Sequence, residues 1–398
     1  MHKRFNKSQK QGALTTGLLL AGILLGTSGC NNNASEVQQD SNETQRTMER
    51  TRVYVGTYAE PDAESIYLYN LNSETGELTR EAAYKAGENP SYLALSPDRQ
   101  YLYAVNETTS YEGEKSGAVS AFAINGQGAS LSLLSKVASK GGAPCYIALN
   151  GNTVLVANYV GGNVAAYAVQ ADGKLSTATT VQQHEGTGPN EKRQEAPHAH
   201  YFAPGPTGKY NFAVDLGADK VFAYTLEDGK LTSPTVAFNA APGSGPRHLA
   251  FRPDGKYAYL LHELNSTLVA LAYNAENGTF EEVQALSTLP EGFTENNQPA
   301  AVKVSPDGKY VYSSNRGHNS MAVFAIDAET GKIRLVETVP TGGDWPRDFS
   351  IDPSGSILLV ANERSNNITT FKIDKTTGKL TATGHEAQVP KPVNLVFE

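Results

Sequence analysis

A proline that precedes a strand-like run of alternating residues recurs seven times along this chain. Successive prolines are separated by 54, 53, 49, 53, 47 and 46 residues; they are Pro90, Pro144, Pro197, Pro246, Pro299, Pro346 and Pro392. A repeat with a period of about 50 residues is typical of proteins built from copies of one supersecondary unit. This repeat limits the possible folds more than any other feature of the sequence.

Each of the first six copies has the same plan of four short strands. In the copy that begins at Pro299, we predict strands at 301–304, 310–314 and 321–326, and a fourth strand after 329–332. The segment between the first two strands, Ser-Pro-Asp-Gly-Lys, contains the proline, aspartate and glycine that hairpin turns require. Each copy is therefore predicted to be a four-stranded antiparallel sheet.

The last copy is incomplete, which indicates how the repeat closes. Residues 392–397 provide one strand, and residues 52–58 resemble the second strand of the other copies. Pairing of these segments would complete a seventh sheet and remove two exposed sheet edges. A four-stranded unit of this period is the blade of a β-propeller. We therefore predict an all-β fold over residues 51–398, a seven-bladed β-propeller with four-stranded antiparallel blades.

The composition is that of a soluble globular protein and argues against one class of partner. Of the 398 residues, 39% are apolar and 19% are charged, which are ordinary values. Thirty-three basic and 41 acidic residues give a net charge of −8, so the protein has no excess of positive charge to offset phosphate repulsion. Nucleic acid is therefore not expected as a partner. We also expect the protein to be a monomer.

The first fifty residues predict export and lipid anchoring. A basic segment precedes the apolar residues 13–26, and small residues lead to Cys30, which resembles a bacterial lipoprotein signal. We predict a signal peptide at 1–29, lipidation of Cys30, and a polar tether at 30–50. The lipid anchor would be the only membrane contact of a domain at the cell envelope, facing the periplasm or the exterior. A plain secretory signal with an incidental Cys30 is the alternative.

Many polar and charged side chains occupy two sets of positions, and the positions in each set are equivalent from blade to blade. The innermost strands of a propeller line its axis, so the residues after the repeating prolines converge at one mouth of the channel. They are Ser91, Cys145, His198, Arg247, Ala300, Arg347 and Val393. The ends of the second strands form the other set: Asn106-Glu107, Asn158-Tyr159, Asp215-Leu216, His262-Glu263, Asn315-Arg316 and Asn362-Glu363. We therefore predict a cationic channel mouth in an anionic protein.

Structural roles remain open for several of these side chains. A repeated asparagine or aspartate at a strand end often caps a turn by binding backbone amides. This alternative applies to Asn106, Asn158, Asp215, Asn315 and Asn362. Arg247 and Arg347 are alternatively buried clamps on the carbonyls of neighbouring blades. His200 projects to the same side of its strand as His198, so at least one of the two is expected to be structural.

The order of the motifs resembles one enzyme family. The motifs are Pro197-His-Ala-His200, Ala213-Val-Asp-Leu-Gly217, Gly243-Ser-Gly-Pro-Arg-His248, His262-Glu-Leu-Asn-Ser-Thr267, Ser305-Pro-Asp-Gly308, Ser314-Asn-Arg-Gly-His318 and Pro346-Arg-Asp-Phe349. Together they resemble the bacterial lactonase propellers, the cycloisomerase-2-type 6-phosphogluconolactonases related to fungal carboxymuconate lactonizing enzyme. The resemblance covers residues 52–398 and implies a seven-bladed fold. It also implies that His198, Arg247, Glu263 and Arg316 match that family's proposed catalytic residues.

Hydrolysis of a sugar lactone requires proton transfer and charge stabilisation. A base activates water, hydrogen-bond donors stabilise the tetrahedral oxyanion, and an acid protonates the departing ring oxygen. His198 and Glu263 are the candidates for proton transfer, and Arg247 and Arg316 can supply fixed positive charge. The candidate substrate-binding residues are His200, Asp215, Asn315, His318 and Arg347.

The predicted function is hydrolysis of a small anionic or sugar lactone, with 6-phospho-D-glucono-1,5-lactone as the first candidate. No nucleotide-binding fingerprint or nucleophile elbow is present, and the histidines lack metal-ligand spacing, so no cofactor or metal is expected. The predicted export departs from a cytosolic pathway and leaves the physiological lactone open. Two alternatives remain: a muconate-type cycloisomerase, and a non-catalytic propeller that is a binding module on the cell envelope.

Overall fold

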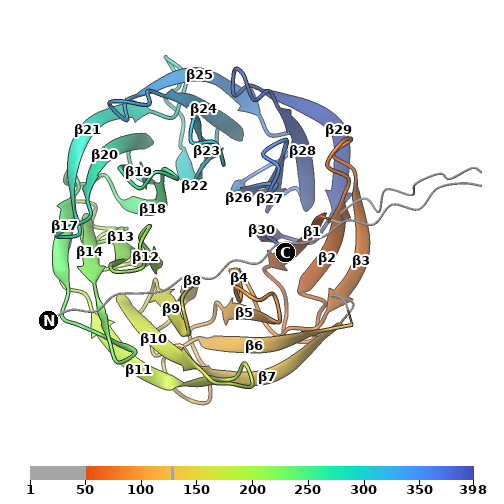
Figure 1. Ribbon diagram of the computed structural model, residues 1–398, viewed down its shortest axis with the longest axis vertical. Helices are drawn as coiled ribbons and strands as arrows, with labels where there is room; N and C mark the ends of the chain where they lie inside the picture. Colours follow the sequence, from red (N-terminus) through yellow and green to blue (C-terminus); the bar gives the residue numbers. More distant parts are fainter. Residues whose placement is uncertain (1–50, 127–129) are drawn as a thin grey trace, which may run out of the picture. The chain divides into compact units, whose positions relative to one another are not determined.

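The computed structural model describes residues 51–126 and 130–398. Within these ranges the chain forms seven four-stranded antiparallel sheets in a ring (Figure 1). The seven-bladed propeller that the repeat predicts is therefore confirmed. The predicted signal peptide at 1–29, lipidated Cys30 and tether at 30–50 lie outside the described residues. No helix in the described part of the chain has the length and apolar character needed to cross a membrane.

Each blade contains four strands that follow one another from the channel axis outwards. Blade 1 contains β30 (Pro392–Phe397), β1 (Thr51–Thr57), β2 (Ile66–Leu71) and β3 (Leu78–Tyr84). Blade 2 contains β4 (Leu93–Leu95), β5 (Tyr101–Asn106), β6 (Ala118–Asn125) and β7 (Ser130–Ala138). Blade 3 contains β8 (Pro144–Asn150), β9 (Thr153–Asn158), β10 (Asn163–Val169) and β11 (Leu175–Gln183). Blade 4 contains β12 (Ala199–Pro204), β13 (Asn211–Asp215), β14 (Lys220–Tyr224) and β17 (Thr235–Asn239).

The remaining three blades follow the same order. Blade 5 contains β18 (Pro246–Phe251), β19 (Tyr257–His262), β20 (Thr267–Asn274) and β21 (Thr279–Ser287). Blade 6 contains β22 (Gln298–Val304), β23 (Tyr310–Arg316), β24 (Ser320–Ile326) and β25 (Ile333–Pro340). Blade 7 contains β26 (Pro346–Ile351), β27 (Ile357–Asn362), β28 (Asn367–Ile373) and β29 (Leu380–Gln388).

The ring closes where the first and last strands of the propeller pair. β1 lies antiparallel to β30, with Val55 opposite Leu395, so the predicted closure is confirmed. Blade 4 differs from the repeat by an additional hairpin of β15 (Leu226–Glu227) and β16 (Lys230–Leu231). β4 is only three residues long, and the backbone N–H of Leu93 donates to the side chain of Asn394 at 3.0 Å.

Seven clusters of buried apolar side chains hold the ring together, and each lies between two neighbouring blades. Between blades 5 and 6, for example, Leu261 packs in one cluster with Val302 and Phe324. Tyrosine hydroxyls also link adjacent blades: Tyr259 donates to the carbonyl of Gly331 at 3.1 Å. Each such hydrogen bond contributes about 1 kcal/mol. The packed ring is a rigid support for side chains at the channel mouths.

All seven innermost strands run in the same direction along the axis. Their starts therefore lie on one side of the ring, together with the ends of the second strands; we call this side the proline face. The opposite side carries the turns between first and second strands, such as residues 305–309, and we call it the turn face. The candidate residues predicted from the sequence belong to the proline face.

Candidate active site

On the proline face, a buried carboxylate contacts three arginines. Glu263 follows β19 and is only 2% exposed. Its Oε1 accepts a hydrogen bond from Arg193 Nη2 at 2.6 Å, and its Oε2 accepts one from Arg316 Nη2 at 2.7 Å. Arg247 Nε lies 3.0 Å from Oε2 as an ion pair without a well-directed hydrogen bond. These four residues are called the arginine cluster.

The loop before β18 brings two members of the cluster together. Asp219 accepts hydrogen bonds from the backbone N–H groups of Gly243 and Gly245, at 2.7 and 2.8 Å, and so fixes the segment that leads to Arg247. Gly245 has a φ of 60°, a conformation that glycine adopts without strain. Its carbonyl accepts the N–H of Glu263 at 2.8 Å. The glycine-rich motif before the proline therefore positions both the carboxylate and one guanidinium.

The arginine cluster contains more positive than negative groups at neutral pH. Burial raises the pKa of Glu263, but the guanidinium groups of Arg316, Arg247 and Arg193 outweigh it and hold this pKa at about 2. Glu263 is therefore ionised at neutral pH. Burial and the neighbouring Arg316 lower the pKa of Arg247 to about 9, so Arg247 remains a cation there. Three positive groups around one negative group leave an excess of positive charge within the arginine cluster.

His198 is connected to the arginine cluster through Tyr159. Its Nδ1 lies 2.9 Å from the carbonyl oxygen of Tyr159, which fixes Nδ1–H as a donor and leaves Nε2 for proton transfer. The imidazole stacks on the Tyr159 ring, with 4.5 Å between ring centroids. The Tyr159 hydroxyl accepts a hydrogen bond from Arg193 at 3.1 Å. His198 Nε2 also lies 3.2 Å from Glu195 Oε1, at the exposed edge of the site.

A second carboxylate lies at the same channel mouth. Glu107 follows β5, and its oxygens accept hydrogen bonds from the Tyr58 hydroxyl at 3.0 and 3.1 Å and from Ser91 Oγ at 2.5 Å. Arg347 Nη2 lies 3.9 Å from Glu107 Oε1. Burial raises the pKa of Glu107, and Arg347 and the hydrogen bond from Ser91 only partly oppose it. The two carboxylates therefore have pKa values shifted in opposite directions, as in many acid–base sites.

A small cavity on the proline face lies beside Glu107 and Arg247. Its volume is about 10 Å³, roughly the space of one water molecule. Its lining includes Glu107, Arg247, Arg347 and His200. His200 Nδ1 is buried and has no hydrogen-bond partner among the described residues. Burial and the cations Arg247 and Arg347 lower the pKa of His200, so this imidazole is neutral.

The candidate residues fall into two groups by position. The structure brings His198, Arg247, Glu263 and Arg316 into one network, and places Arg347 and His200 at the adjacent cavity. Arg247 also donates to the carbonyl of Ala300 in the next blade, as the clamp alternative predicts.

Three other candidate side chains make their hydrogen bonds within the protein. Asp215 accepts the backbone N–H of His198 at 2.8 Å and contacts His184 at 2.6 Å. Asn315 donates to the carbonyl of Thr288 at 2.9 Å. His318 Nδ1 lies 2.7 Å from Ser320 Oγ. Asp215 therefore fixes the backbone of His198, and a contact with substrate remains a prediction for all three.

Four residues of the site were not selected from the sequence. Glu107 and Tyr159 occupy the strand-end position that also carries Glu263, so their position in the repeat was a usable signal. Arg193 lies in the connection between β11 and β12, whose unusual length was the only indication. Tyr58 directly follows β1, the second strand of blade 1, so it occupies the same strand-end position and contacts Glu107 of the next blade. In the described ranges, no group of three or more His, Cys, Asp or Glu side chains could hold a metal ion.

Comparison with known proteins identifies the family. Residues 52–397 match the family described as "Lactonase, 7-bladed beta-propeller". The chain belongs to this lactonase family. The family assignment made from the motifs is confirmed.

Three relatives indicate the range of the family. A 6-phosphogluconolactonase of Bacillus subtilis is 42% identical over 299 residues, which are 74% of this chain and 83% of that protein. The crystal structure of a candidate 6-phosphogluconolactonase from Bacteroides fragilis has a TM-score of 0.82 at 36% identity, over 89% of this chain and 99% of that chain. The periplasmic gluconolactonase of Pseudomonas aeruginosa has a TM-score of 0.80 at 33% identity, over 87% and 98%.

Proposed function

We propose that this lactonase hydrolyses a six-carbon sugar lactone at the proline face. The observation that carries the proposal is the arginine cluster, which places an excess of positive charge beside two side chains able to transfer protons. The names of the Bacillus and Pseudomonas relatives support an aldonolactone substrate. The candidate substrates are 6-phosphoglucono-1,5-lactone and unphosphorylated glucono-1,5-lactone.

Hydrolysis of the lactone needs two proton transfers: one from the attacking water and one to the ring oxygen. As the water oxygen bonds to the carbonyl carbon, a base accepts a proton and the carbonyl oxygen becomes an oxyanion. Collapse of this intermediate breaks the bond between the carbonyl carbon and the ring oxygen. The ring oxygen takes a proton from an acid, and the product is an open-chain hydroxy acid.

Glu107 is the base in this proposal, and His198 Nε2 is the proton donor. The raised pKa of Glu107 brings it closer to the working pH, where a general base is most effective. Glu263 was the other candidate base, but its pKa of about 2 makes it a weak base, and its oxygens are engaged by Arg193 and Arg316. Its proposed role is to position the guanidinium groups.

Arg247 and Arg316 provide fixed charge for the developing oxyanion. Both are held by several partners, Arg316 by Glu263 and by the carbonyl of Gln298 at 2.9 Å. Charge that is already in place does not have to reorganise during the reaction, which is the main source of electrostatic catalysis.

Arg193 is proposed to contact an anionic arm of the substrate. Its side chain is 32% exposed, whereas those of Arg247 and Arg316 are 2% and 5% exposed. A phosphate remote from the reacting bond is bound equally in the ground and transition states. Recognition by Arg193 would therefore act on substrate affinity.

An envelope location is part of the proposal. Export and lipidation of Cys30 would place the propeller outside the cytosol, as the name of the periplasmic Pseudomonas relative states for that protein. An extracytosolic enzyme would act on lactones formed or released there. A monomer suffices, because each proposed catalytic residue belongs to one chain.

Replacing Arg193 with methionine tests the substrate assignment. We expect KM for 6-phosphogluconolactone to rise about tenfold to a hundredfold with little change in kcat, because a charged hydrogen bond is lost. KM for gluconolactone should change little. The measurement is proton release in a pH-stat, with Lys192→Met as the control because Lys192 is the exposed neighbour.

The same assay decides between the proposal and its alternatives. Turnover of a muconate but of no lactone would assign a cycloisomerase. If neither class reacts faster than in buffer, the enzymatic proposal fails and a binding module remains. If Arg193→Met raises KM for both lactones equally, Arg193 does not recognise the phosphate.

A further inference from the structure

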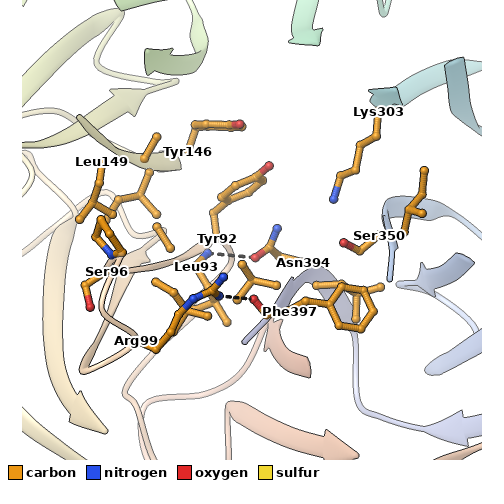
Figure 2. A pocket seen from close by; sticks show the side chains of 18 residues that line it. Tyr92, Leu93, Ser96, Arg99, Tyr146, Leu149, Lys303, Ser350, Asn394 and Phe397 are labelled. Carbon is orange, nitrogen blue, oxygen red and sulfur yellow. Dashed lines mark hydrogen bonds between the residues drawn. The ribbon is translucent and has the colours of Figure 1, made fainter. Parts of the chain in front are cut away.

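The other end of the channel contains a larger cavity. It has a volume of about 550 Å³ and is formed by residues of β4, β8, β26 and β30, with Lys303 of β22 on one wall (Figure 2). Ligand sites commonly measure about 300 to 1,000 Å³. Ile351, on this wall, is four residues along β26 from Arg347, or roughly 13 Å of strand. The cavity therefore opens toward the turn face, and we call it the turn-face cavity.

A layer of aromatic rings separates this cavity from the candidate active site. Tyr92 and Tyr146 lie 4.2 Å apart between centroids, and Tyr146 lies 4.6 Å from Tyr201 and 5.3 Å from His248. Tyr92 lines both the turn-face cavity and the small cavity beside Arg247. A ligand in the turn-face cavity would therefore not contact the arginine cluster.

The charged lining of the turn-face cavity is entirely basic. Its two charged residues are Lys303 and Arg99, in a protein whose net charge is −8. Arg99, at the rim, donates to the carbonyl of Phe397 at 2.8 Å. Lys303 extends its ammonium group into the space between Tyr92, Asn394 and Ser350 (Figure 2). A basic pocket of this kind favours an anion.

Lys303 is held only weakly by its acidic neighbour. Its Nζ lies 3.4 Å from Asp348 Oδ1, beyond the roughly 2.7 to 2.9 Å of a charge-assisted hydrogen bond. That oxygen is buried and has no hydrogen-bond partner among the described residues. The other oxygen of Asp348 accepts from Asn394 Nδ2 at 2.8 Å and from the Leu395 N–H at 3.2 Å. The ammonium group also lies over the Phe349 ring, 5.7 Å from its centroid, and at least two of its three donors remain available to a ligand.

We propose that the turn-face cavity is a second ligand site, which binds a small organic anion. The carboxylate or phosphate group pairs with Lys303, and Ser350 and the Tyr92 hydroxyl offer further hydrogen bonds. The body of the ligand lies against the rings of Tyr92 and Tyr146 and the aliphatic side chains around them, such as Leu149. A few convergent polar groups on a mainly apolar wall are typical of small-molecule sites. The site is independent of the proposed lactonase activity.

Isothermal titration of the full chain tests this site. The probes are benzoate and gluconate as carboxylates, glucose 6-phosphate as a phosphate ester, and methyl glucoside as a neutral ring. We expect at least one anionic probe to bind, and Lys303→Met to weaken that binding at least tenfold through loss of a charged hydrogen bond. Lys303→Arg should retain it, and Arg193→Met should not affect it. Lactone turnover should be unchanged in Lys303→Met.

The control variant is Lys309→Met, on the same blade, whose side chain is 65% exposed and outside the cavity lining. It should bind the probes like the wild type. Loss of binding in Lys303→Met counts as support only if the melting temperature of this variant stays near that of Lys309→Met. If Lys303→Met melts at a lower temperature, anion binding by Lys303→Arg and by Arg99→Met decides instead. The proposal is overturned if no anionic probe binds, if Lys303→Met binds as tightly as the wild type, or if methyl glucoside binds equally well.

Discussion

Replacing Glu107 with glutamine is expected to lower kcat for lactone hydrolysis by about a hundredfold to ten thousandfold, the usual contribution of a general base. The amide keeps the size of the side chain and can still accept a hydrogen bond from Tyr58 or Ser91, but it cannot take a proton from water. In the wild type, kcat/KM should fall as pH decreases through the pKa of Glu107, which burial raises. The variant should lack this acidic limb. Proton release measured from pH 4 to pH 8 gives both results.

Glu112→Gln is the matched control, because Glu112 is exposed in the same loop after β5. It should keep both the rate and the pH profile of the wild type. A Glu107→Gln variant that loses rate but keeps the acidic limb would show that another group is the base and that Glu107 has only a structural role.

Replacing Glu263 with glutamine is expected to destabilise the propeller by about 3 to 5 kcal/mol at neutral pH. The substitution leaves the guanidinium groups of Arg247 and Arg316 buried without their counter-charge, and breaking a buried ion pair from one side carries a cost of this size. Urea unfolding measures the difference. Glu276→Gln, an exposed change in the same blade, should leave stability within experimental error. Equal stability of all three proteins would contradict the role assigned to Glu263.

The pH dependence of this difference follows from the pKa of Glu263. The folded-state pKa of about 2 lies below the ordinary value of 4.5, so ionised Glu263 stabilises the fold above about pH 5. The contribution, about 3 kcal/mol, is lost as pH falls toward 2. The stability gap between wild type and Glu263→Gln should therefore narrow between pH 6 and pH 3. A gap independent of pH would show that Glu263 is not ionised in the folded protein.

The fold was predictable because the repeat specifies it several times over. Each blade has its own proline, turn and alternating strands, and residues 392–397 pair with β1 as the incomplete last copy requires. The hairpin of β15 and β16 was not predicted, because it occurs in one blade and leaves no trace in the period.

The site was predictable only where it follows the repeat. Arg247 occupies the position after a proline, and Glu263 and Arg316 occupy strand ends, so their convergence follows from blade geometry. Arg193 lies in a connection that the repeat does not constrain, and only the packed structure shows its contact with Glu263. Which of the two carboxylates, Glu107 or Glu263, could act as a base depends on how many cations surround each, and spacing along the chain contains no such information.

The most direct test of the account is kcat for hydrolysis of glucono-1,5-lactone by Arg316→Met. This substrate has no phosphate, so a loss of rate cannot be attributed to recognition of an anionic arm. If the arginine cluster stabilises the oxyanion, kcat should fall roughly a hundredfold to a thousandfold, while Arg334→Met, an exposed change in the same blade, should match the wild type. An unchanged kcat, with an effect confined to KM for the phosphorylated lactone, would contradict the central claim that this cluster stabilises the transition state.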